Sequence, residues 1–544
     1  MERSNNKLIM RTKYLTKWLL FMISALSLNG QNDNDKFRKA FDNINQTVLK
    51  AQLGILASDW TEGRQAGEKG ELIASDYIAS MLQLYGVKPG GDYPGIRGFS
   101  GISENREKTW FQNFVLLKTS PGDEQLLKIR TSEGNTSESI SFKHNIDFTI
   151  RSVSNDIEIE APVAFVGYGF KNEKLKYDDF GKRDLKGKLI LKISGAPGFA
   201  KEVLSPSEIA ATVREGENIA RKMGAAGIIE FNPGSTVTGA QPGTQMNDLS
   251  PSETNPLYNR EWADYTLPDK MSPDIFLKIT TTAKIANEIL KGTGLVLDDY
   301  IRKLESGSSE PIPEIKGKSI YLKTTVRTET VRARNVIGVI EGKEPDKIIV
   351  LGAHYDHLGS ENGYIWNGAD DNGSGAAGVM TLAKAIMETG IKPSKSIIIA
   401  LWSAEEMGLL GSRFYVENLP YPWENLSLNV NFDMISRYLS DNDKKKVNMI
   451  YTESYPIFRT ITEENLKKAG IDLEVDYQPS KDPPGGSDHR TFVEAGIPVM
   501  RFKPGHREQY HTPADDIDTV NWEIMEKIVR ISFANIWYLA NNEW

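Results

Sequence analysis

The 544-residue chain contains no cysteine. It therefore has no disulfide, no thiolate zinc ligand, no thiol nucleophile and no cysteine that could carry a lipid after cleavage. It also lacks the Gly-x-Ser-x-Gly turn that presents the nucleophile in one large class of serine hydrolases. These absences exclude thiol enzymes and argue against that class of serine hydrolase.

The chain also lacks a large net charge and long apolar runs. The chain has 65 basic and 73 acidic residues, and a net charge of −8 argues against a nucleic-acid partner. An apolar run from Trp18 to Leu28 follows four basic residues between positions 7 and 17, which is typical of a secretory signal peptide over residues 1–30. The run is too short to span a bilayer as a helix, and no other run is long enough. We expect a periplasmic or secreted protein without a stable membrane anchor, with a signal anchor as the alternative.

The length exceeds that of one ordinary domain, and the character of the chain changes twice. Residues 64–86 have apolar positions at helical spacing. From about residue 120 short β-rich runs appear, including a predicted buried strand from Gly227 to Phe231, and residues 232–275 are rich in loop-forming residues. We predict an N-terminal part of one domain over 31–120, an inserted domain over 121–318 and the remainder of the first domain over 319–544.

After about residue 320 the pattern is α/β. Near-continuous apolar runs predict strands that are buried on both faces of a mixed, mostly parallel sheet flanked by helices. The predicted strands cover residues 335–340, 347–354, 396–404 and 428–434, and a helix is predicted over 375–388, with another starting near Gly408.

Five candidate metal ligands follow these strands or lie in the loops just beyond them, where open α/β sheets bind ligands. They are His354, Asp370, Glu406, Asp433 and His511. Two imidazoles and three carboxylates suit Zn²⁺, and one bridging carboxylate would allow two ions roughly 3.5–4 Å apart. Glu405, beside Glu406, is a spare carboxylate of the kind that a general base requires.

The segments GAHYDH, GADDNGSG, AEEMGLLGS, NFDM and YHTPADD resemble the signature segments of the M28 zinc aminopeptidases, in the same order and at similar spacings. The resemblance covers residues 331–520, with a weaker match near 63–92. Residues 177–192 and 220–231 resemble a protease-associated (PA) domain, which is often inserted in this family. The resemblance implies a zinc-peptidase fold, two Zn²⁺ per chain, peptide substrates and release of N-terminal residues.

It also implies individual roles. The five candidate ligands match the family's zinc ligands, with Asp370 as the bridge, and Glu405 matches the general base. Asp356 lies two residues beyond His354 in an extended segment, so its carboxylate can accept the second N–H of that imidazole. Tyr510 matches a tyrosine that hydrogen-bonds the oxyanion formed at the scissile carbonyl.

Several alternatives stay open. Asp370 and Asp371 could cap the following helix, and Tyr510 could be a core aromatic residue. Asp488, His489 and His506 could contact the metal ligands or the substrate, or be structural. Carboxypeptidases and dipeptidases share such scaffolds, and glutaminyl cyclases and non-catalytic receptors are further relatives. The occupied ligand positions and Glu405 argue against those last two.

Overall fold

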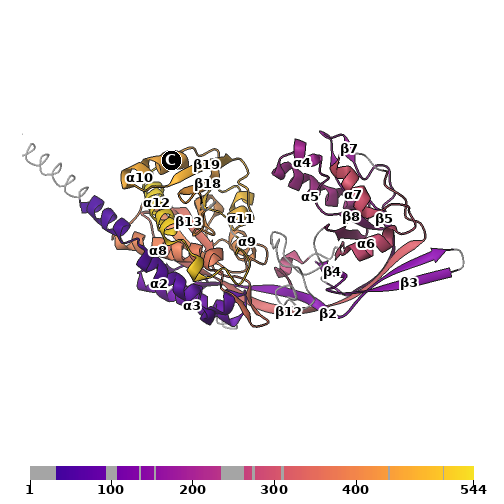
Figure 1. The fold of residues 1–544 in the computed structure, drawn as a ribbon. Coiled ribbons are helices and arrows are strands. Elements are labelled where there is room, and N and C mark those ends of the chain that lie inside the picture. The colour runs from indigo at the N-terminus through magenta and orange to yellow at the C-terminus, as the bar shows by residue number, and fades with distance from the viewer. Residues whose placement is uncertain are drawn as a thin grey trace, which may run out of the picture. The chain divides into compact units, whose positions relative to one another are not determined.

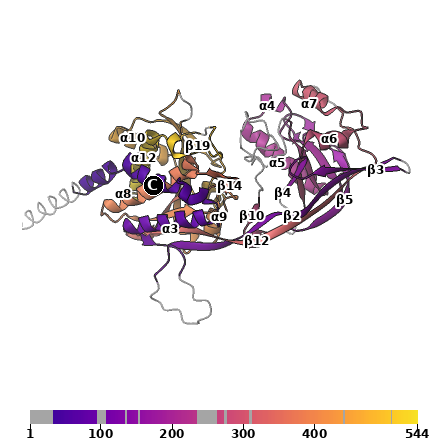
Figure 2. The same cartoon turned by 60° about the horizontal axis from the view of Figure 1, so that its bottom comes forward.

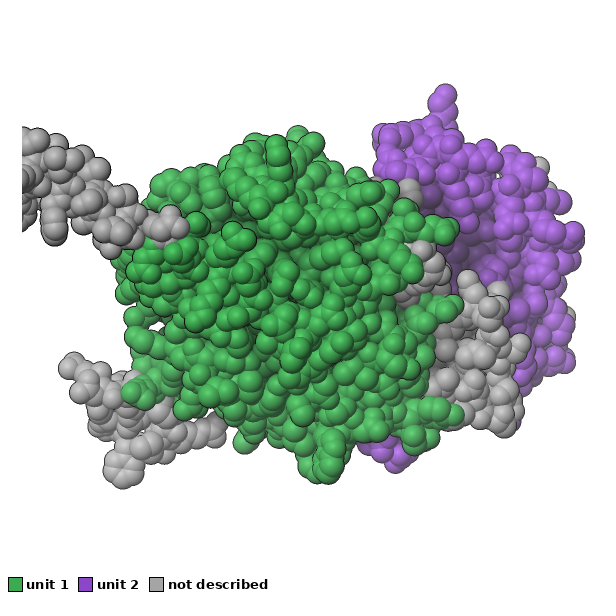
Figure 3. Space-filling view, turned by 60° about the vertical axis from the view of Figure 1, so that its left-hand side comes forward, with its two compact units in different colours: residues 1–114, 332–544 green, residues 115–331 purple. Residues whose placement is uncertain are grey.

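The computed structural model describes residues 32–93, 107–133, 136–151, 155–233, 263–271, 276–307, 311–438, 442–505 and 508–544. The chain forms two compact units, residues 1–114 with 332–544 (unit 1) and residues 115–331 (unit 2) (Figure 3). Composition placed the boundaries at 120/121 and 318/319. The two sets of boundaries differ, but both lie within the same long strands, β2 (Phe111–Glu133) and β12 (Lys318–Ile340), rather than in loops.

Unit 1 contains a mixed, mostly parallel sheet, which confirms the predicted fold class. The strand order is β19-β18-β20-β17-β13-β16-β12. β13 lies parallel to β16 and β17, and β17 is parallel to β20, whereas β12 is antiparallel to β16. The bounds are β13 Glu344–His354, β16 Lys395–Trp402, β17 Leu426–Phe432, β18 Lys446–Thr452, β19 Glu474–Ser480 and β20 Val499–Lys503, with β1 (Lys88–Pro89) pairing to β12.

Both faces of this sheet are buried because alternate side chains of the apolar strands point in opposite directions. Ile349 and Leu351 of β13 join the large core formed with α2, α3, α8, α10 and α12, whereas Ile348 and Val350 join a smaller core with α9 and α11 (Figure 1). The helices are α2 Gln46–Leu56, α3 Lys69–Leu84, α8 Gly375–Glu388, α9 Leu410–Glu417, α10 Ile457–Ala469, α11 His489–Glu494 and α12 Trp522–Asn541.

The start of α8 lies unusually close to the end of β17. A Cβ atom added to Gly375 would lie 2.4 Å from the carbonyl oxygen of Phe432, so only glycine fits there. Gly378 is similarly close to Ile435, with 2.9 Å from an added Cβ to the isoleucine Cδ1. These glycines hold the loop before α8 against the ends of the parallel strands.

The helix predicted over 64–86 is shorter in the structure. Residues Asp59–Arg64 form a 3₁₀ turn, η1, in which Glu62, Gly63 and Arg64 have positive φ angles, and α3 begins only at Lys69. Within the described ranges, no helix is long and apolar enough to cross a membrane. Residues 1–31, which include the predicted signal peptide, lie outside those ranges.

Unit 2 has its own cores, and residues 319–324 of β12 pair antiparallel with β5 at one edge of its strands. β5 (Ile157–Phe165), β8 (Leu189–Ile193), β9 (Gly227–Phe231) and β11 (Leu277–Thr281) run parallel, and β4 (Phe148–Arg151) closes one edge antiparallel. The helices are α4 Ala200–Val203, α5 Pro206–Lys222, α6 Ala283–Leu290 and α7 Leu297–Glu305. β2 pairs with β3 (Thr136–Lys143) and β10 (Asp264–Thr266), as Figure 2 lets the reader follow. The described residues also form two short strand pairs, β6–β7 (Lys171–Asn172, Tyr177–Asp178) and, in unit 1, β14–β15 (Gly359–Glu361, Tyr364–Trp366).

Candidate metal centre

Three of the candidate ligands, His354, Glu406 and Asp433, lie at or just beyond the carboxyl ends of three neighbouring parallel strands in unit 1. In the sheet register His354 pairs with Trp402, so the last residue of β13 lies beside the end of β16. Gly352 pairs with Asn431 of β17, two residues before Asp433. Because parallel strands end at the same edge, residues that are far apart in the sequence become neighbours.

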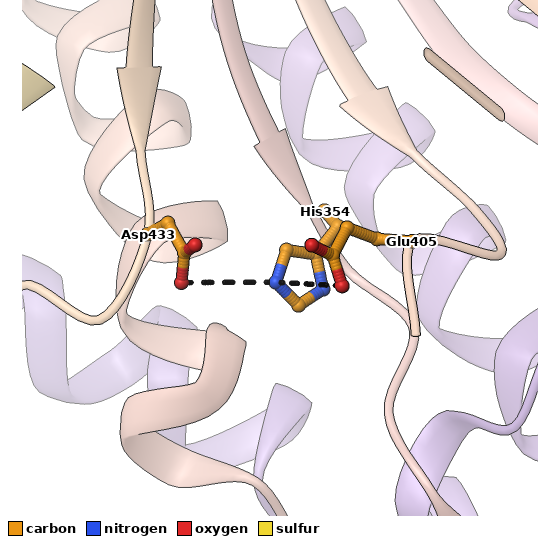
Figure 4. A group of neighbouring side chains, drawn as sticks. All are labelled: His354, Glu405 and Asp433. Atoms are coloured by element: carbon orange, nitrogen blue, oxygen red, sulfur yellow. Dashed lines mark ion pairs between the residues drawn. The ribbon is translucent and has the colours of Figure 1, made fainter. Parts of the chain in front are cut away.

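One group of side chains surrounds the imidazole of His354. Its Nε2 atom lies 3.8 Å from Glu405 Oε2 and 3.8 Å from Asp433 Oδ1, and Figure 4 shows these three side chains. The same Nε2 atom lies 3.5 Å from Asp371 Oδ1. His354 with Glu405 and Asp433, and His354 with Asp371 and Glu406, form two groups whose ligand atoms are close enough to hold a metal ion.

A second group surrounds His511. Its Nε2 atom lies 3.0 Å from Asp371 Oδ2 and 3.2 Å from Glu406 Oε2. The two carboxylate oxygens of Asp371 therefore face the two imidazoles, one each. Such a carboxylate is suited to bridge two cations.

Asp370, the bridge expected from the sequence, faces elsewhere. Its Oδ1 accepts hydrogen bonds from the backbone N–H of Ser436 (2.9 Å) and the hydroxyl of Ser436 (2.7 Å), and its Oδ2 lies 3.7 Å from Nε of Arg437. These contacts do not favour Asp370 as a bridging ligand, and the neighbouring carboxylate that faces both imidazoles is Asp371. The side chains of these two adjacent aspartates point in different directions. Their positions in the sequence differ by one residue, so sequence spacing alone fits either of them as the bridging ligand.

Asp356 supports the site through more than one contact. Its carboxylate accepts the backbone N–H groups of Glu405 (3.1 Å) and Glu406 (3.3 Å), which fixes both glutamates at the end of β16. Nδ1 of His354 lies 3.3 Å from the backbone oxygen of Asp356 and 3.7 Å from its carboxylate. A proton on Nδ1 faces these oxygens, which leaves Nε2 for a metal.

Three supporting residues were not among the predicted site residues. His357 is fully buried, and its Nδ1 lies 2.7 Å from Glu406 Oε1. Asp515 accepts the backbone N–H groups of Asp370 (3.0 Å) and Asp371 (2.9 Å), and Arg437 donates to Asp515 at 2.6 Å. The second histidine of GAHYDH and the final aspartates of YHTPADD were the available signals, but spacing alone cannot give their direction.

The residues with open roles divide into two sets. The Tyr510 ring stacks on the His511 ring with centroids 3.8 Å apart, and burial together with nearby carboxylates raises the pKa of Tyr510, so its hydroxyl stays a potential donor. Asp488 and His489 are fully buried, and Nδ1 of His489 lies 3.0 Å from Arg501. His506 lies outside the described residues.

The site concentrates buried carboxylates whose negative charge bound cations would compensate. Burial and the neighbouring carboxylates raise the pKa of Glu405. Burial would also raise the pKa of Glu406, but His511 and His357 more than offset it and the pKa falls well below its usual range. Asp433 Oδ1 is buried and has no hydrogen-bond partner among the described residues. Buried anions of this kind are normally paired or bound to metal, and carboxylates with imidazoles suit Zn²⁺.

Comparison with known proteins agrees with this chemistry. Residues 335–536 match the model of Peptidase family M28. Leupeptin-inactivating enzyme 1 of Streptomyces exfoliatus is 32% identical over 204 residues, covering 36% of this chain and 42% of that protein. The Glutamate carboxypeptidase 2 homolog of Caenorhabditis elegans is 30% identical over 247 residues (39% and 31%), and Leucine aminopeptidase 2 of Trichophyton rubrum is 35% identical over 171 residues (30% and 32%). The chain thus spans less than half the length of these relatives.

Two solved structures share the fold over most of the chain. An aminopeptidase from Aneurinibacillus sp. strain AM-1 has a TM-score of 0.57 at 19% identity and covers 93% of this chain and 97% of that one. BSAP, a zinc aminopeptidase from Bacillus subtilis, has a TM-score of 0.50 at 19% identity and covers 92% and 96%. At these identities the likeness establishes the fold.

Proposed function

We propose that the chain is a di-zinc exopeptidase of Peptidase family M28, whose model residues 335–536 match, and that it removes residues from the free N-terminus of peptides. The observation that carries this proposal is the position of Asp371, with one oxygen 3.5 Å from His354 and the other 3.0 Å from His511. A single carboxylate between two imidazoles, with further carboxylates on either side, is a donor set for two ions.

His354, Asp371 and Asp433 would hold one ion, and Asp371, Glu406 and His511 the other. When bound, zinc polarises the scissile carbonyl and lowers the pKa of water. Asp356 and His357 orient the ligands through the contacts described above, and Asp515 holds the loop that carries Asp371.

Glu405 is the proposed general base. Its Oε2 would take a proton from the attacking water and deliver it to the nitrogen of the leaving amine, so that the amine departs neutral. The backbone N–H of Glu405 is anchored by Asp356, which fixes where its side chain starts. The Tyr510 hydroxyl would donate to the developing oxyanion.

The free N-terminus is the favoured substrate end because, among the described arginines near the site, Arg437 and Arg490 pair with carboxylates and Arg501 is buried. Arg437 donates to Asp515 at 2.6 Å and also to Thr519, and Arg490 pairs with Asp482 (2.6 Å) and Glu494 (3.1 Å) on the outside of the unit. Arg501 is 1% exposed and lies against His489. A carboxypeptidase would need an accessible cation for the substrate's terminal carboxylate. Carboxypeptidase activity is the second candidate function, because the chain resembles a glutamate carboxypeptidase homolog.

We also propose that the protein is exported and that it carries an inserted domain. The N-terminal pattern of basic and apolar residues supports export to the periplasm or medium. The separate cores of residues 115–331 support an independently folded, PA-like insertion, and none of the proposed site residues lies within it.

The test combines metal dependence with substrate polarity. Chelation should abolish hydrolysis of an amino-acid 4-nitroanilide, and added Zn²⁺ should restore it; full activity in metal-stripped protein contradicts the metal proposal. Acetylating the amine of a cleaved dipeptide should then abolish turnover, whereas amidating its carboxyl end should not. The reverse pattern assigns the carboxypeptidase activity instead.

A further inference from the structure

A fully buried arginine lies behind the metal centre, in a segment that precedes the region matched by the family model. Arg64 ends the 3₁₀ turn η1 (Asp59–Arg64) and is 0% exposed. The matched region begins only at residue 335. Burying a guanidinium is costly unless all of its donors are used, so its contacts show what the residue does.

The hydrogen bonds that its side chain donates to the described residues go to backbone carbonyl oxygens. Nε donates to Tyr355 at 2.6 Å, Nη1 donates to Asn367 at 2.6 Å and also to Leu56, and Nη2 donates to Gly368 at 2.9 Å. In return, the backbone oxygen of Arg64 accepts the N–H of His357 at 3.2 Å. One side chain thus joins three segments of the chain.

Two of these segments carry the proposed ligands. Tyr355 follows His354 directly, and Gly368 lies three residues before Asp371. A planar guanidinium donates in fixed directions, so it sets the distance between the carbonyls that it joins. The separation of His354 from Asp371 therefore depends on Arg64.

The local backbone is built for this placement. Gly63 is pressed against the β14–β15 hairpin: a Cβ atom added to it would lie 2.3 Å from the carbonyl oxygen of Gly359 and 2.7 Å from that of Trp366. Arg64 itself has φ 53°, in the left-handed region that non-glycine residues adopt at a cost. The side-chain contacts of Arg64 compensate for that cost.

We propose that Arg64 is a positioning residue that holds the His354 segment and the Asp371 segment at the separation required for zinc binding. The proposal rests on the proposed function in assuming that the centre binds zinc. It differs from a purely electrostatic role, in which any cation at this position would offset the nearby carboxylates Asp356, Asp515 and Asp371.

Arg64→Lys separates these two roles because lysine keeps the charge but not the planar set of donors. Zinc affinity of the full chain is measured by competition with a chromophoric chelator, and the melting temperature is measured on the metal-free protein. Arg64→Lys should weaken zinc binding by about 10–100-fold, as is typical when groups that orient metal ligands are changed.

The matched control is Arg530→Lys. Arg530 also donates to a backbone carbonyl, that of Ile44 at 2.8 Å, and pairs with Glu526 at 3.0 Å, contacts that include no proposed site residue. The Arg530→Lys substitution should lower the melting temperature of the metal-free protein without changing its zinc affinity. If Arg64→Lys binds zinc as tightly as wild type, or if Arg530→Lys loses affinity equally, the positioning role is overturned.

A surface change covers the case in which Arg64→Lys does not fold. The exposed Asp59 accepts a hydrogen bond from the Asn367 side chain at 2.9 Å and so ties η1 to the same segment. Asp59→Ala should weaken zinc binding in the same direction but by less than tenfold, and unchanged affinity contradicts the proposal. Wild-type protein that binds no zinc would instead refute the proposed function.

Discussion

The choice between Asp370 and Asp371 as the bridging ligand gives a sharp test, because two adjacent aspartates are expected to behave differently. In Asp371→Asn the carboxylate that faces both His354 and His511 loses its charge while its size is kept. In Asp370→Asn the amide oxygen can still accept the hydrogen bonds from Ser436, at 2.9 and 2.7 Å in the native structure. Only the first change removes a proposed metal ligand.

The expected magnitudes follow from burial. Removing one partner from a buried charge pair typically costs about 3–5 kcal/mol, and at 1.4 kcal/mol per tenfold this weakens zinc binding by about 10²–10⁴-fold. Both ions should be affected because Asp371 faces both imidazoles. Asp370→Asn acts only through the loop and through Arg437, so we expect a loss of no more than about 10–100-fold.

The assay is zinc content by atomic emission after dialysis against buffers of fixed free Zn²⁺, with circular dichroism as the control for folding. Asp371→Asn should lose both ions at free zinc concentrations at which Asp370→Asn keeps them. If Asp370→Asn loses both ions and Asp371→Asn keeps them, the geometric argument fails and the original assignment of the bridge stands.

Two further predictions concern a proton acceptor and a buried carboxyl. Glu405→Gln should keep both metals and lose about 10²–10⁴-fold in turnover, and if it loses zinc instead, the roles of Glu405 and Glu406 are exchanged. In unit 2, burial raises the pKa of Asp179 from 3.8 to about 6, so its contribution to the free energy of unfolding is fully present below pH 3.8 and is lost as pH rises through 6. Asp179→Asn keeps an acceptor for the N–H groups of Tyr168 and Phe170. Because asparagine does not ionise, the variant should avoid the decrease of up to about 3 kcal/mol in the free energy of unfolding that the wild type undergoes as pH rises. Urea unfolding should therefore favour the variant more at pH 8 than at pH 4, and an equal difference at both values contradicts the argument.

Much of unit 1 could be predicted because its local patterns are strong. The apolar runs at β13, β16 and β17 are long enough to require a sheet buried on both faces, and α8 has the predicted bounds, Gly375–Glu388. In unit 2 the predicted strand Gly227–Phe231 coincides with β9, but the prediction was less complete elsewhere because the strands are short and are separated by loops and helices. The boundary of that unit lies inside β12, where the composition does not change.

The site shows the same division between what a sequence reports and what it leaves open. A motif gives the kinds of residue and their order, but side-chain direction depends on how the backbone is held. Asp371 faces the imidazoles because Asp515, from a segment 144 positions away, accepts its backbone N–H. The same aspartate accepts the N–H of Asp370, so one distant carboxylate sets the orientation of both members of the pair.

The supports of the centre also explain why its buried charges can coexist. Asp356, Asp515 and Arg64 bind mainly backbone N–H or C=O groups rather than the ligand side chains themselves. They fix the positions of the ligand-bearing segments while leaving carboxylate and imidazole atoms available to cations. Because the supports act on backbone atoms, the residues that they hold can be of any type, and no local sequence pattern links a support to its ligand. Arg64 and His354 are separated by 290 positions in the chain, and only the folded structure brings η1 against the end of β13.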